Sequence, residues 1–219
     1  MQDGIILVDK PAGMTSFGVV ARIRRVLSKE QNKKVKVGHT GTLDPFATGL
    51  MIIVVGKECK NASMYSKLDK IYETTIHLGQ TSTTGDPEGE IVDISDRIPT
   101  LNEIKSSFEK FRGEITQRPP IYSAIKINGK RAYRLAREGK TVEIPTRQVN
   151  IFDLELIEYS YPELKIRTHV SSGTYIRSLA EDIGSELEVG GYCTDLRRIS
   201  ISKWDINQAK SLSSLGIFD

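Results

Sequence analysis

The sequence predicts an α+β fold in which helices flank a largely antiparallel sheet. Two patterns support this class. Short runs rich in β-branched residues are mixed with amphipathic segments of helical period. The strict strand–helix–strand rhythm of a parallel sheet is missing. The chain has 219 residues, with no internal repeat or low-complexity linker, so we expect one domain over residues 1–219.

The N-terminal part of the chain predicts a strand, a helix, a second strand and a short helix. Residues 4–10 (GIILVDK) form an apolar run that stops at Pro11. Residues 15–27 read as an amphipathic helix, with Thr15 or Ser16 as N-cap. The apolar run at residues 50–55 (LMIIVV) predicts a buried strand, and a helix is expected near residues 58–65.

The middle of the chain contains a strand, a turn and a helix. Residues 70–79 favour a strand through their β-branched content, although strict alternation is not evident. Residues 81–90 (TSTTGDPEGE) are typical of turns. Residues 101–111 predict a helix. Its expected inward residues are Leu101, Ile104, Phe108 and Phe111.

The remaining elements are shorter. Residues 121–139 begin as a strand, turn at Asn128-Gly129 and continue as a short basic helix that ends at Gly139. Two or three strands are expected between residues 142 and 170. Residues 174–187 predict a helix, residues 193–201 a strand and residues 206–215 a last short helix.

The basic residues concentrate in two segments. Residues 10–36 hold eight basic residues and one acid, and residues 112–147 hold nine and three. The acids concentrate in residues 81–109. Because the net charge is only +3, this distribution says more than the total, and it fits a protein that binds a polyanion. Solvated helix faces would give the same pattern, so charge alone leaves both interpretations open.

Several classes of function receive no support. The longest apolar run has six residues and the N-terminus lacks a basic signal region, so we expect neither a membrane span nor secretion. Neither a P-loop nor a G-x-G-x-x-G loop occurs. The two cysteines and three histidines are scattered, so no zinc or other metal site is expected.

The segment GHTGTLDPFATGLMIIVVG, residues 38–56, joins a loop of small polar residues to the apolar run. Asp44 is its single carboxylate. Glycines allow close approach of a ligand to the backbone, and threonines supply hydroxyl groups. A carboxylate fixed in this way to a buried strand suits a catalytic nucleophile or base. Asp-Pro is also a common turn opener, so local chemistry leaves a purely structural role open.

The same segment resembles the catalytic motif of the bacterial tRNA pseudouridine-55 synthases of the TruB type. Further motifs of that family follow in order, so the resemblance extends over about residues 4–205. They are DKPAGMTS (residues 9–16), KIYETTIHLGQTSTTGDPEGE (70–90), QRPPIYSAIKINGKRAYRLAREG (117–139), VSSGTYIRSLAEDIGSEL (170–187) and TDLRRISI (194–201).

The resemblance implies the pseudouridine synthase fold with an inserted RNA-binding thumb at about residues 112–147. It implies a cytoplasmic isomerase that acts on the T-arm of tRNA without a cofactor or metal. Such an enzyme converts uridine 55 to pseudouridine: it flips the base out of the loop, cleaves its glycosidic bond and rejoins it through carbon 5.

The resemblance also assigns roles to individual residues. Asp44 matches the catalytic aspartate, and Arg177 the arginine that pairs with it, so we expect Asp44 to be ionised. Tyr72 matches the tyrosine that stacks on the target base and assists proton removal from carbon 5. His39 matches the histidine that fills the place of the flipped base. Further substrate-binding residues are Thr40, Gly41, Tyr175 and Leu196. The expected RNA-binding residues are Lys10, Lys126, Lys130, Arg131, Arg134 and Arg137.

One departure from the family concerns the C-terminus. Most bacterial members carry a further RNA-binding domain of the PUA type, and this chain ends at Asp219. Either the protein lacks that domain or the sequence was cut before it. We expect a stand-alone monomer that needs no guide RNA. The alternatives are a non-catalytic RNA-binding protein on the same scaffold, which the intact set of site residues disfavours, and a glycosidase, for which no second carboxylate lies near Asp44 in sequence.

Overall fold

The computed structural model describes residues 3–123, 125–127, 129–138 and 143–217, and it confirms the α+β class with a mostly antiparallel arrangement of strands. The chain divides into two compact units. Unit 1 comprises Met1–Tyr72 and Arg197–Asp219, and unit 2 comprises Glu73–Leu196. The expectation that the whole chain acts as one catalytic domain stays a prediction.

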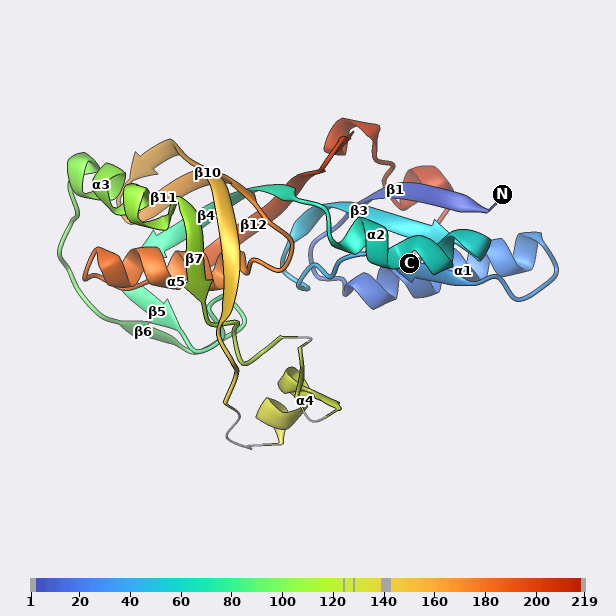
Figure 1. Ribbon diagram of the computed structural model, residues 1–219, viewed down its shortest axis with the longest axis horizontal. Helices are drawn as coiled ribbons and strands as arrows, with labels where there is room; N and C mark the ends of the chain where they lie inside the picture. The colour runs from blue at the N-terminus through green and yellow to red at the C-terminus, as the bar shows by residue number, and fades with distance from the viewer. Residues whose placement is uncertain (1–2, 124, 128, 139–142, 218–219) are drawn as a thin grey trace. The chain divides into compact units, whose positions relative to one another are not determined.

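Unit 1 is built around strand β3. Its elements are β1 (Gly4–Lys10), α1 (Ser16–Glu30), β2 (Val37–His39), β3 (Thr48–Val55), η1 (Gly56–Asn61), α2 (Ala62–Ser66), the start of β4 (Lys70–Leu78), the end of β12 (Gly191–Ile201), β13 (Trp204–Asp205), η2 (Ile206–Gln208) and η3 (Ser213–Leu215). β1 pairs antiparallel with β3 (Figure 1). β2 also pairs antiparallel with β3. The end of β12 joins β3 in parallel, with Arg197 opposite Thr48.

The core of unit 1 explains why the apolar run at residues 50–55 is continuous. Every residue from Leu50 to Val55 is at most 2% exposed, so both faces of β3 are covered. On one face Leu50, Ile52 and Val54 cluster with Ile201. Each buried aliphatic side chain of this kind contributes about 1.5–3 kcal/mol. β3 is therefore a rigid support for the loop that precedes it.

Helix α1 begins where the sequence predicts. The Thr15 hydroxyl accepts a hydrogen bond from the backbone N–H of Gly18 at 2.9 Å, so Thr15 is the N-cap. Ser16 is the first helical residue, and its side chain is buried. Val19, Val20 and Ile23 form the buried face of the helix.

Unit 2 contains the rest of β4 and most of the remaining elements. They are β5 (Gln80–Ser82), β6 (Ile91–Asp93), α3 (Leu101–Phe111), β7 (Gly113–Gln117), β8 (Lys126–Ile127), β9 (Lys130–Arg131), α4 (Ala132–Arg137), β10 (Arg147–Ser160), β11 (Glu163–Val170), α5 (Ile176–Glu186) and the first part of β12. Within the unit the strands follow the order β12-β4-β11-β10-β7. β10 pairs antiparallel with both β11 and β7 (Figure 1).

Strand β4 alternates more regularly than its sequence suggests. Every second residue from Lys70 to Leu78 is buried, including the polar Lys70 and Thr74. The alternation is hidden in the sequence because these two polar side chains face inward. Thr74 is satisfied there, since its hydroxyl donates to the Asp195 carbonyl at 2.6 Å.

Two expectations are wrong in detail. Leu101 is 44% exposed, because it is the first residue of α3 and lies before the buried face that Ile104 and Phe108 form. In place of a last helix, residues 206–215 contain two 3₁₀ turns, η2 and η3. The segment offers no long apolar stripe to bury, so only single turns form.

The thumb segment, residues 112–147, contains β7, a β8–β9 hairpin and α4. The predicted turn residue Asn128 and the helix end at Gly139 lie outside the described residues. Within the described part of the chain, none of the helices has both the length and the apolar character needed to cross a membrane.

Candidate active site

Asp44 lies in a loop, residues 40–47, that precedes β3, and the segment at residues 9–16 holds this loop in place. The Ser16 hydroxyl accepts from the N–H of Leu43 at 2.8 Å and donates to the carbonyl of the same residue at 2.9 Å. Because Ser16 is 2% exposed, water does not compete for these bonds. The residue before Asp44 is thereby fixed to the start of α1.

The residue after Asp44 is fixed as well. The Pro45 carbonyl accepts from the Gly13 N–H at 2.8 Å and from the Lys10 ammonium at 3.1 Å. Lys10 also donates to the Pro11 carbonyl at 2.7 Å. Two motifs that are distant in sequence therefore form one structure, in which Asp44 is held from both sides.

A third restraint comes from Arg198 at the end of β12. Its guanidinium donates to the Leu50 carbonyl at 2.6 Å and to the Gly41 carbonyl at 3.3 Å. The side chain is 1% exposed. Arg198 therefore ties the beginning of the Asp44 loop to the strand that follows it.

The neighbouring Arg197 connects the same elements on their exposed side. Its guanidinium forms an ion pair with Asp9 at 2.8 Å and donates to the Thr48 hydroxyl at 3.2 Å. The Arg-Arg pair in TDLRRISI thus has two separate roles: Arg197 links β1 to β3, and Arg198 holds the loop.

Buried cations dominate the electrostatics around the loop. Burial lowers the pKa of Lys10 from 10.5 to about 8, against the opposing attraction of Asp44 and with a smaller lowering by Arg198. Burial likewise lowers the pKa of Lys70 to about 8, and Arg198 adds to this effect. Both ammonium groups are still mostly charged at neutral pH, and the attraction between Lys10 and Asp44 places a cation beside the Asp44 loop.

The structure corrects the expectation for Lys10. The sequence assigns it to the RNA-binding surface, but its side chain is 0% exposed and its ammonium donates to two backbone carbonyls. A lysine committed in this way cannot contact phosphate from the surface. Lys10 instead positions the Asp44 loop.

The other residues of unit 1 that the sequence assigns to the site lie on β2, on β4 and in the Asp44 loop. Asp44 is half-buried, and so is His39 at the end of β2. The Thr40 hydroxyl donates to the Ile52 carbonyl at 3.3 Å, which makes it part of the loop anchor. Tyr72 is 7% exposed on the buried side of β4.

Arg177 belongs to unit 2, at the start of α5, and is 2% exposed. Its guanidinium donates to Asp86 at 3.0 Å, to the Thr84 carbonyl at 2.6 Å and to the Tyr122 carbonyl at 2.8 Å. These bonds fix its orientation. A buried guanidinium needs such a carboxylate, because an unpaired buried charge is costly.

The turn at residues 82–90 is built around Asp86. Its carboxylate accepts from the Thr84 hydroxyl at 2.5 Å and from the Glu88 N–H at 3.0 Å, and it is 4% exposed. The Ser82 hydroxyl donates to the Asp86 carbonyl at 2.5 Å. The sequence identifies this segment only as a turn, whereas the structure shows that it supplies the counter-ion of Arg177.

Two further acids, Glu181 and Asp182, lie on α5, and Glu181 is close enough to act on this ion pair. Burial raises the pKa of Glu181 from 4.5 to about 7, opposed by Arg177, while Asp182 and Asp86 add to the increase. Burial also raises the pKa of Asp182, to about 6. Glu181 packs directly against the turn, since a Cβ at Gly85 would stand 2.7 Å from its Oε1.

Tyr175 connects the two ends of the thumb. Its N–H donates to Gln117 at 2.8 Å, and Gln117 donates to the Tyr175 carbonyl at 3.0 Å. The Arg147 guanidinium lies 4.6 Å from the centre of the Tyr175 ring. Because Arg147 pairs with Gln117 in the sheet, the chain between these two residues leaves the sheet and returns to it beside Tyr175.

The remaining expected residues are only partly described. Leu196 is 5% exposed at the end of the unit 2 part of β12. Lys130 and Arg131 are exposed on β9, as an RNA-binding surface requires. The side chains of Lys126, Arg134 and Arg137 lie outside the described residues.

Each unit therefore brings together part of the expected site. Unit 1 contains Asp44, His39 and Tyr72, and unit 2 contains Arg177. The pairing of Asp44 with Arg177 stays a prediction. Among the described residues, no group of three or more His, Cys, Asp or Glu side chains is placed to hold a metal ion.

Sequence reasoning did not assign roles to Ser16, Asp86 or Arg198. Ser16 and Asp86 lie inside recognised motifs, yet both residue types are common in caps and turns, so their long-range partners are not evident. In the sequence, Arg198 is one residue of a basic strand motif. A charged residue at an inward position of a strand is the signal that could have identified it.

Comparison with known proteins finds matches over most of the chain. Residues 24–176 match the model of the TruB family pseudouridylate synthase N-terminal domain. The tRNA pseudouridine synthase B of Mycobacterium sp. (strain KMS) is 44% identical over 217 residues, which cover 97% of this chain and 71% of that protein. The enzyme of the same name from Corynebacterium jeikeium (strain K411) is 40% identical over 224 residues, with 98% and 71% covered.

A solved structure is also similar. The crystal structure of a Cbf5-Nop10-Gar1 complex contains a chain that superposes with a TM-score of 0.74 at 30% identity. The match covers 97% of this chain but only 53% of the chain in that complex, so this chain spans about half of its structural relative.

Fold, site and matches together define an enzyme class, the tRNA pseudouridine synthases. Within this class the chain belongs to the TruB family, because the family model covers well over half of the chain and the relatives match almost all of it. The family expectation from the sequence is therefore confirmed.

Proposed function

We propose that this enzyme converts uridine 55 in the T-loop of tRNA to pseudouridine, with Asp44 as its catalytic carboxylate and without a cofactor. The observation that carries the proposal is that hydrogen bonds fix the residues on both sides of Asp44. Ser16 binds Leu43, and Lys10 and Gly13 bind Pro45. Catalytic groups need this kind of fixed support, because small displacements reduce the rate strongly.

The substrate base has to leave its stack before it can react. A uridine inside an RNA loop is inaccessible, so the enzyme extrudes it into a pocket. In our proposal Tyr72 stacks on the extruded base and His39 fills the gap that the base leaves. The position of His39 at the end of β2, before the Asp44 loop, supports this assignment.

The reaction exchanges one bond to the sugar for another. The bond from ribose C1′ to N1 breaks, the uracil turns, and a bond from C1′ to C5 forms. The proton on C5 then leaves, and N1 ends protonated. Asp44 can attack the sugar, attack the base or remove a sugar proton. Each route needs the ionised carboxylate that the nearby Lys10 ammonium favours.

Arg177 acts on Asp44 in this proposal, as a cation that orients the carboxylate. Its three bonds to Asp86, Thr84 and Tyr122 support such a role, because they fix the guanidinium before substrate arrives. Asp86 is then a positioning residue. Tyr122 belongs to the thumb, so the same contact links RNA binding to the position of Arg177.

RNA binding rests on phosphate contacts and on shape. We assign the phosphate contacts of the thumb to Lys126, Lys130, Arg131, Arg134 and Arg137, of which Lys130 and Arg131 are visibly exposed. The enzyme acts in the cytoplasm on tRNA as a monomer that needs no guide RNA. The higher identity to tRNA pseudouridine synthases B than to the Cbf5 chain favours this mode of action.

Release of tritium from tRNA labelled at uridine C5 tests the proposal, because the hydrogen leaves only when C5 becomes bonded to the sugar. We expect release of one equivalent from transcribed tRNA and none from the same tRNA with cytidine at position 55. Release that persists after this replacement would contradict the assignment of the position. Absence of release from both would contradict the proposed activity.

A further inference from the structure

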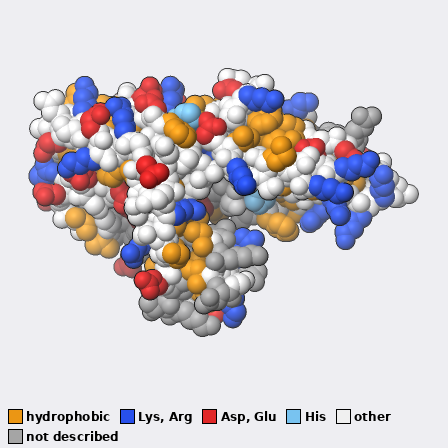
Figure 2. Space-filling model, in the orientation of Figure 1, with side chains coloured by type: hydrophobic (Ala, Val, Ile, Leu, Met, Phe, Trp, Pro, Cys, Tyr) orange, Lys and Arg blue, Asp and Glu red, His pale blue; other side chains and the backbone are white. Residues whose placement is uncertain are grey.

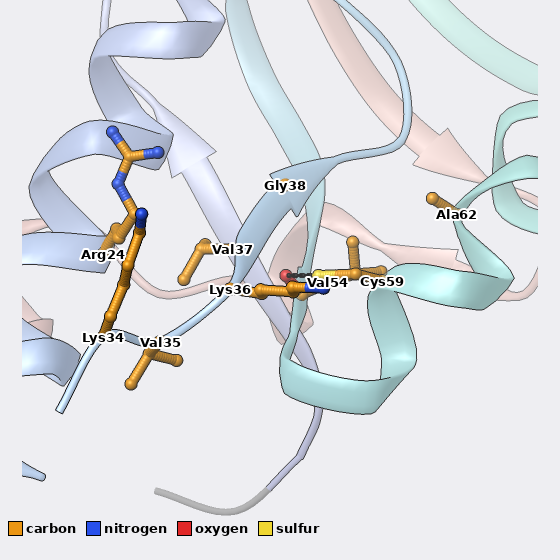
Figure 3. Close-up of a pocket in the computed structure, with 9 residues that line it drawn as sticks. All are labelled: Arg24, Lys34, Val35, Lys36, Val37, Gly38, Val54, Cys59 and Ala62. Carbon is orange, nitrogen blue, oxygen red and sulfur yellow. Dashed lines mark hydrogen bonds between the residues drawn. The ribbon is translucent and has the colours of Figure 1, made fainter.

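A pocket in unit 1 lies apart from the residues assigned above. It has a volume of about 310 Å³. Figure 3 shows Arg24 and Lys34 on one side and Cys59 and Ala62 on the other, with β2 and β3 between them. The full lining is Arg24, Lys34, Val35, Lys36, Val37, Gly38, Val54, Cys59 and Ala62. These residues combine an apolar floor with three cations, and no acid contributes to the lining.

The walls of this pocket are fixed. The N–H of Val35 donates to the Ser28 hydroxyl at 3.1 Å, which ties the loop after α1 back to the helix. The Lys36 carbonyl accepts from the N–H of Gly56 at 2.8 Å. The Cys59 thiol donates to the Val54 carbonyl at 3.4 Å. The pocket is therefore preformed, as small ligand sites usually are.

The cations are available to a ligand. Within the described part of the chain, no ion pair involves Arg24, Lys34 or Lys36. Glu58, the acid on η1, accepts hydrogen bonds from Tyr65 at 2.6 Å and Asn61 at 3.1 Å. Asp3 is a second acid close enough to act on the Cys59 thiol. Figure 2 shows Lys and Arg side chains gathered over the part of unit 1 that carries α1. The exposed cations here include Arg25, Lys29, Lys33 and Lys34.

Cys59 is a wall of the pocket and does not act as a nucleophile. Burial raises the pKa of its thiol, and Lys36 opposes this only in part. The thiol therefore stays protonated at neutral pH and presents an apolar sulfur surface.

We propose that this pocket binds one nucleotide of the substrate RNA outside the flipped uridine, with its phosphate on Lys34, Lys36 and Arg24 and its sugar and base edge against Val37, Val54 and Ala62. Three cations complement a phosphodiester, of which Arg24 also lies 5.7 Å from the centre of the Phe17 ring. The volume is at the small end for ligand sites, which fits a single nucleotide. Gly38 lines the pocket and His39 follows it, so the pocket and the flipping site share β2.

The inference rests on the proposed action on RNA, and a binding experiment separates the two. The double variant Lys34→Ala/Lys36→Ala is compared with Lys57→Ala/Lys60→Ala, which removes two exposed lysines of η1 that do not line the pocket. The dissociation constant for transcribed tRNA is measured over a range of salt concentrations. We expect the pocket variant to bind at least about fivefold more weakly and to lose up to about 0.7 units of salt slope, because the pocket holds one phosphate.

A second variant tests the apolar floor without changing charge. Ala62→Leu fills the pocket, whereas Ala62→Ser keeps its volume. We expect weaker RNA binding only for the leucine variant, with the salt slope unchanged. Turnover of saturated enzyme, measured by tritium release, should stay within about twofold of wild type in every variant, because none of these residues contacts the reacting atoms.

Affinities and slopes of both pocket variants equal to those of their controls would overturn the inference, even when tritium release is normal. Conversely, if wild-type enzyme releases no tritium and the pocket variants still lose affinity, the inference stands and the proposed reaction fails.

Discussion

Gly49 and Arg198 lie in neighbouring strands with their backbones in direct contact. A Cβ on Gly49 would stand 2.4 Å from the Arg198 carbonyl oxygen and 2.6 Å from its nitrogen, and Gly49 has a φ of +108°. Only glycine fits at this point. The close approach lets the Arg198 guanidinium reach the carbonyls of Leu50 and Gly41, so the geometry of the Asp44 loop depends on a missing side chain.

Gly49→Ala should therefore destabilise the protein by about 3 kcal/mol or more, because it adds a steric clash to an unfavourable φ. The control is Gly113→Ala, at a φ of +87° with no atom within 4 Å of the added Cβ, which should cost only about 1 kcal/mol. Denaturant unfolding gives both free energies. Equal losses in the two variants would contradict the role of the Arg198 contact.

Asp86→Asn keeps the shape of the turn and removes the charge that pairs with Arg177. We expect a loss of about 3 kcal/mol in the free energy of unfolding, because a buried guanidinium is left without its counter-ion. Tritium release should slow as well, with little change in affinity for tRNA. Asp93→Asn serves as control, since Asp93 makes an exposed hydrogen bond with Gln80. An Asp86→Asn variant as stable and as active as this control would mean that Asp86 does not position Arg177.

Glu181 makes stability depend on pH. Its pKa is about 7 in the folded protein and 4.5 ordinarily, so folding favours the protonated form and stability is lost as pH rises from about 4.5 through 7. Glu181→Gln stays neutral and should gain on the order of 1–3 kcal/mol over wild type between pH 5 and pH 8.

Unfolding curves at a series of pH values test this, with Glu114→Gln on the exposed face of β7 as control. The gap between Glu181→Gln and wild type should widen with pH, and the gap for the control should stay constant. A constant gap for both variants would show that Glu181 ionises normally.

Lys130 and Arg131 should contribute to RNA affinity more than to turnover. The double variant Lys130→Ala/Arg131→Ala should lower the salt slope of tRNA binding by up to about 0.9 per lost phosphate contact. The rate of saturated enzyme should fall less than the affinity. Lys67→Ala/Lys105→Ala removes two exposed lysines elsewhere as control. A slope equal to that of the control would remove the β8–β9 hairpin from the RNA-binding surface.

Local pattern was sufficient for most of the fold. The apolar run at residues 50–55 and the cap at Thr15 locate their elements, because burial of a continuous strand and capping of a helix are short-range requirements. Long-range polar contacts were not predictable. Lys10 ends a strand at the start of a basic segment, which indicates a surface residue. Its partners, the carbonyls of Pro11 and Pro45, become visible only when β1 and the Asp44 loop meet.

The candidate site likewise contains residues that the local sequence pattern identifies and residues that only the fold identifies. Asp44 stands out because glycines and threonines surround it and a buried strand follows. Asp86 does not, because a carboxylate in a Thr-Gly-Asp-Pro turn is expected for the turn itself. Its pairing with Arg177 joins segments that are far apart in the chain, and only the fold brings them together.

The most direct test of the account is single-turnover tritium release by Asp44→Asn, measured together with its dissociation constant for tRNA. The variant keeps the size of the side chain and most of its hydrogen bonding, and it removes the charge. We predict that release becomes undetectable while the dissociation constant stays within about threefold of wild type, because binding energy comes mainly from phosphates and RNA shape. Release at about a tenth of the wild-type rate or more, a loss of only about 1.4 kcal/mol, would contradict the assignment of Asp44 as the catalytic carboxylate.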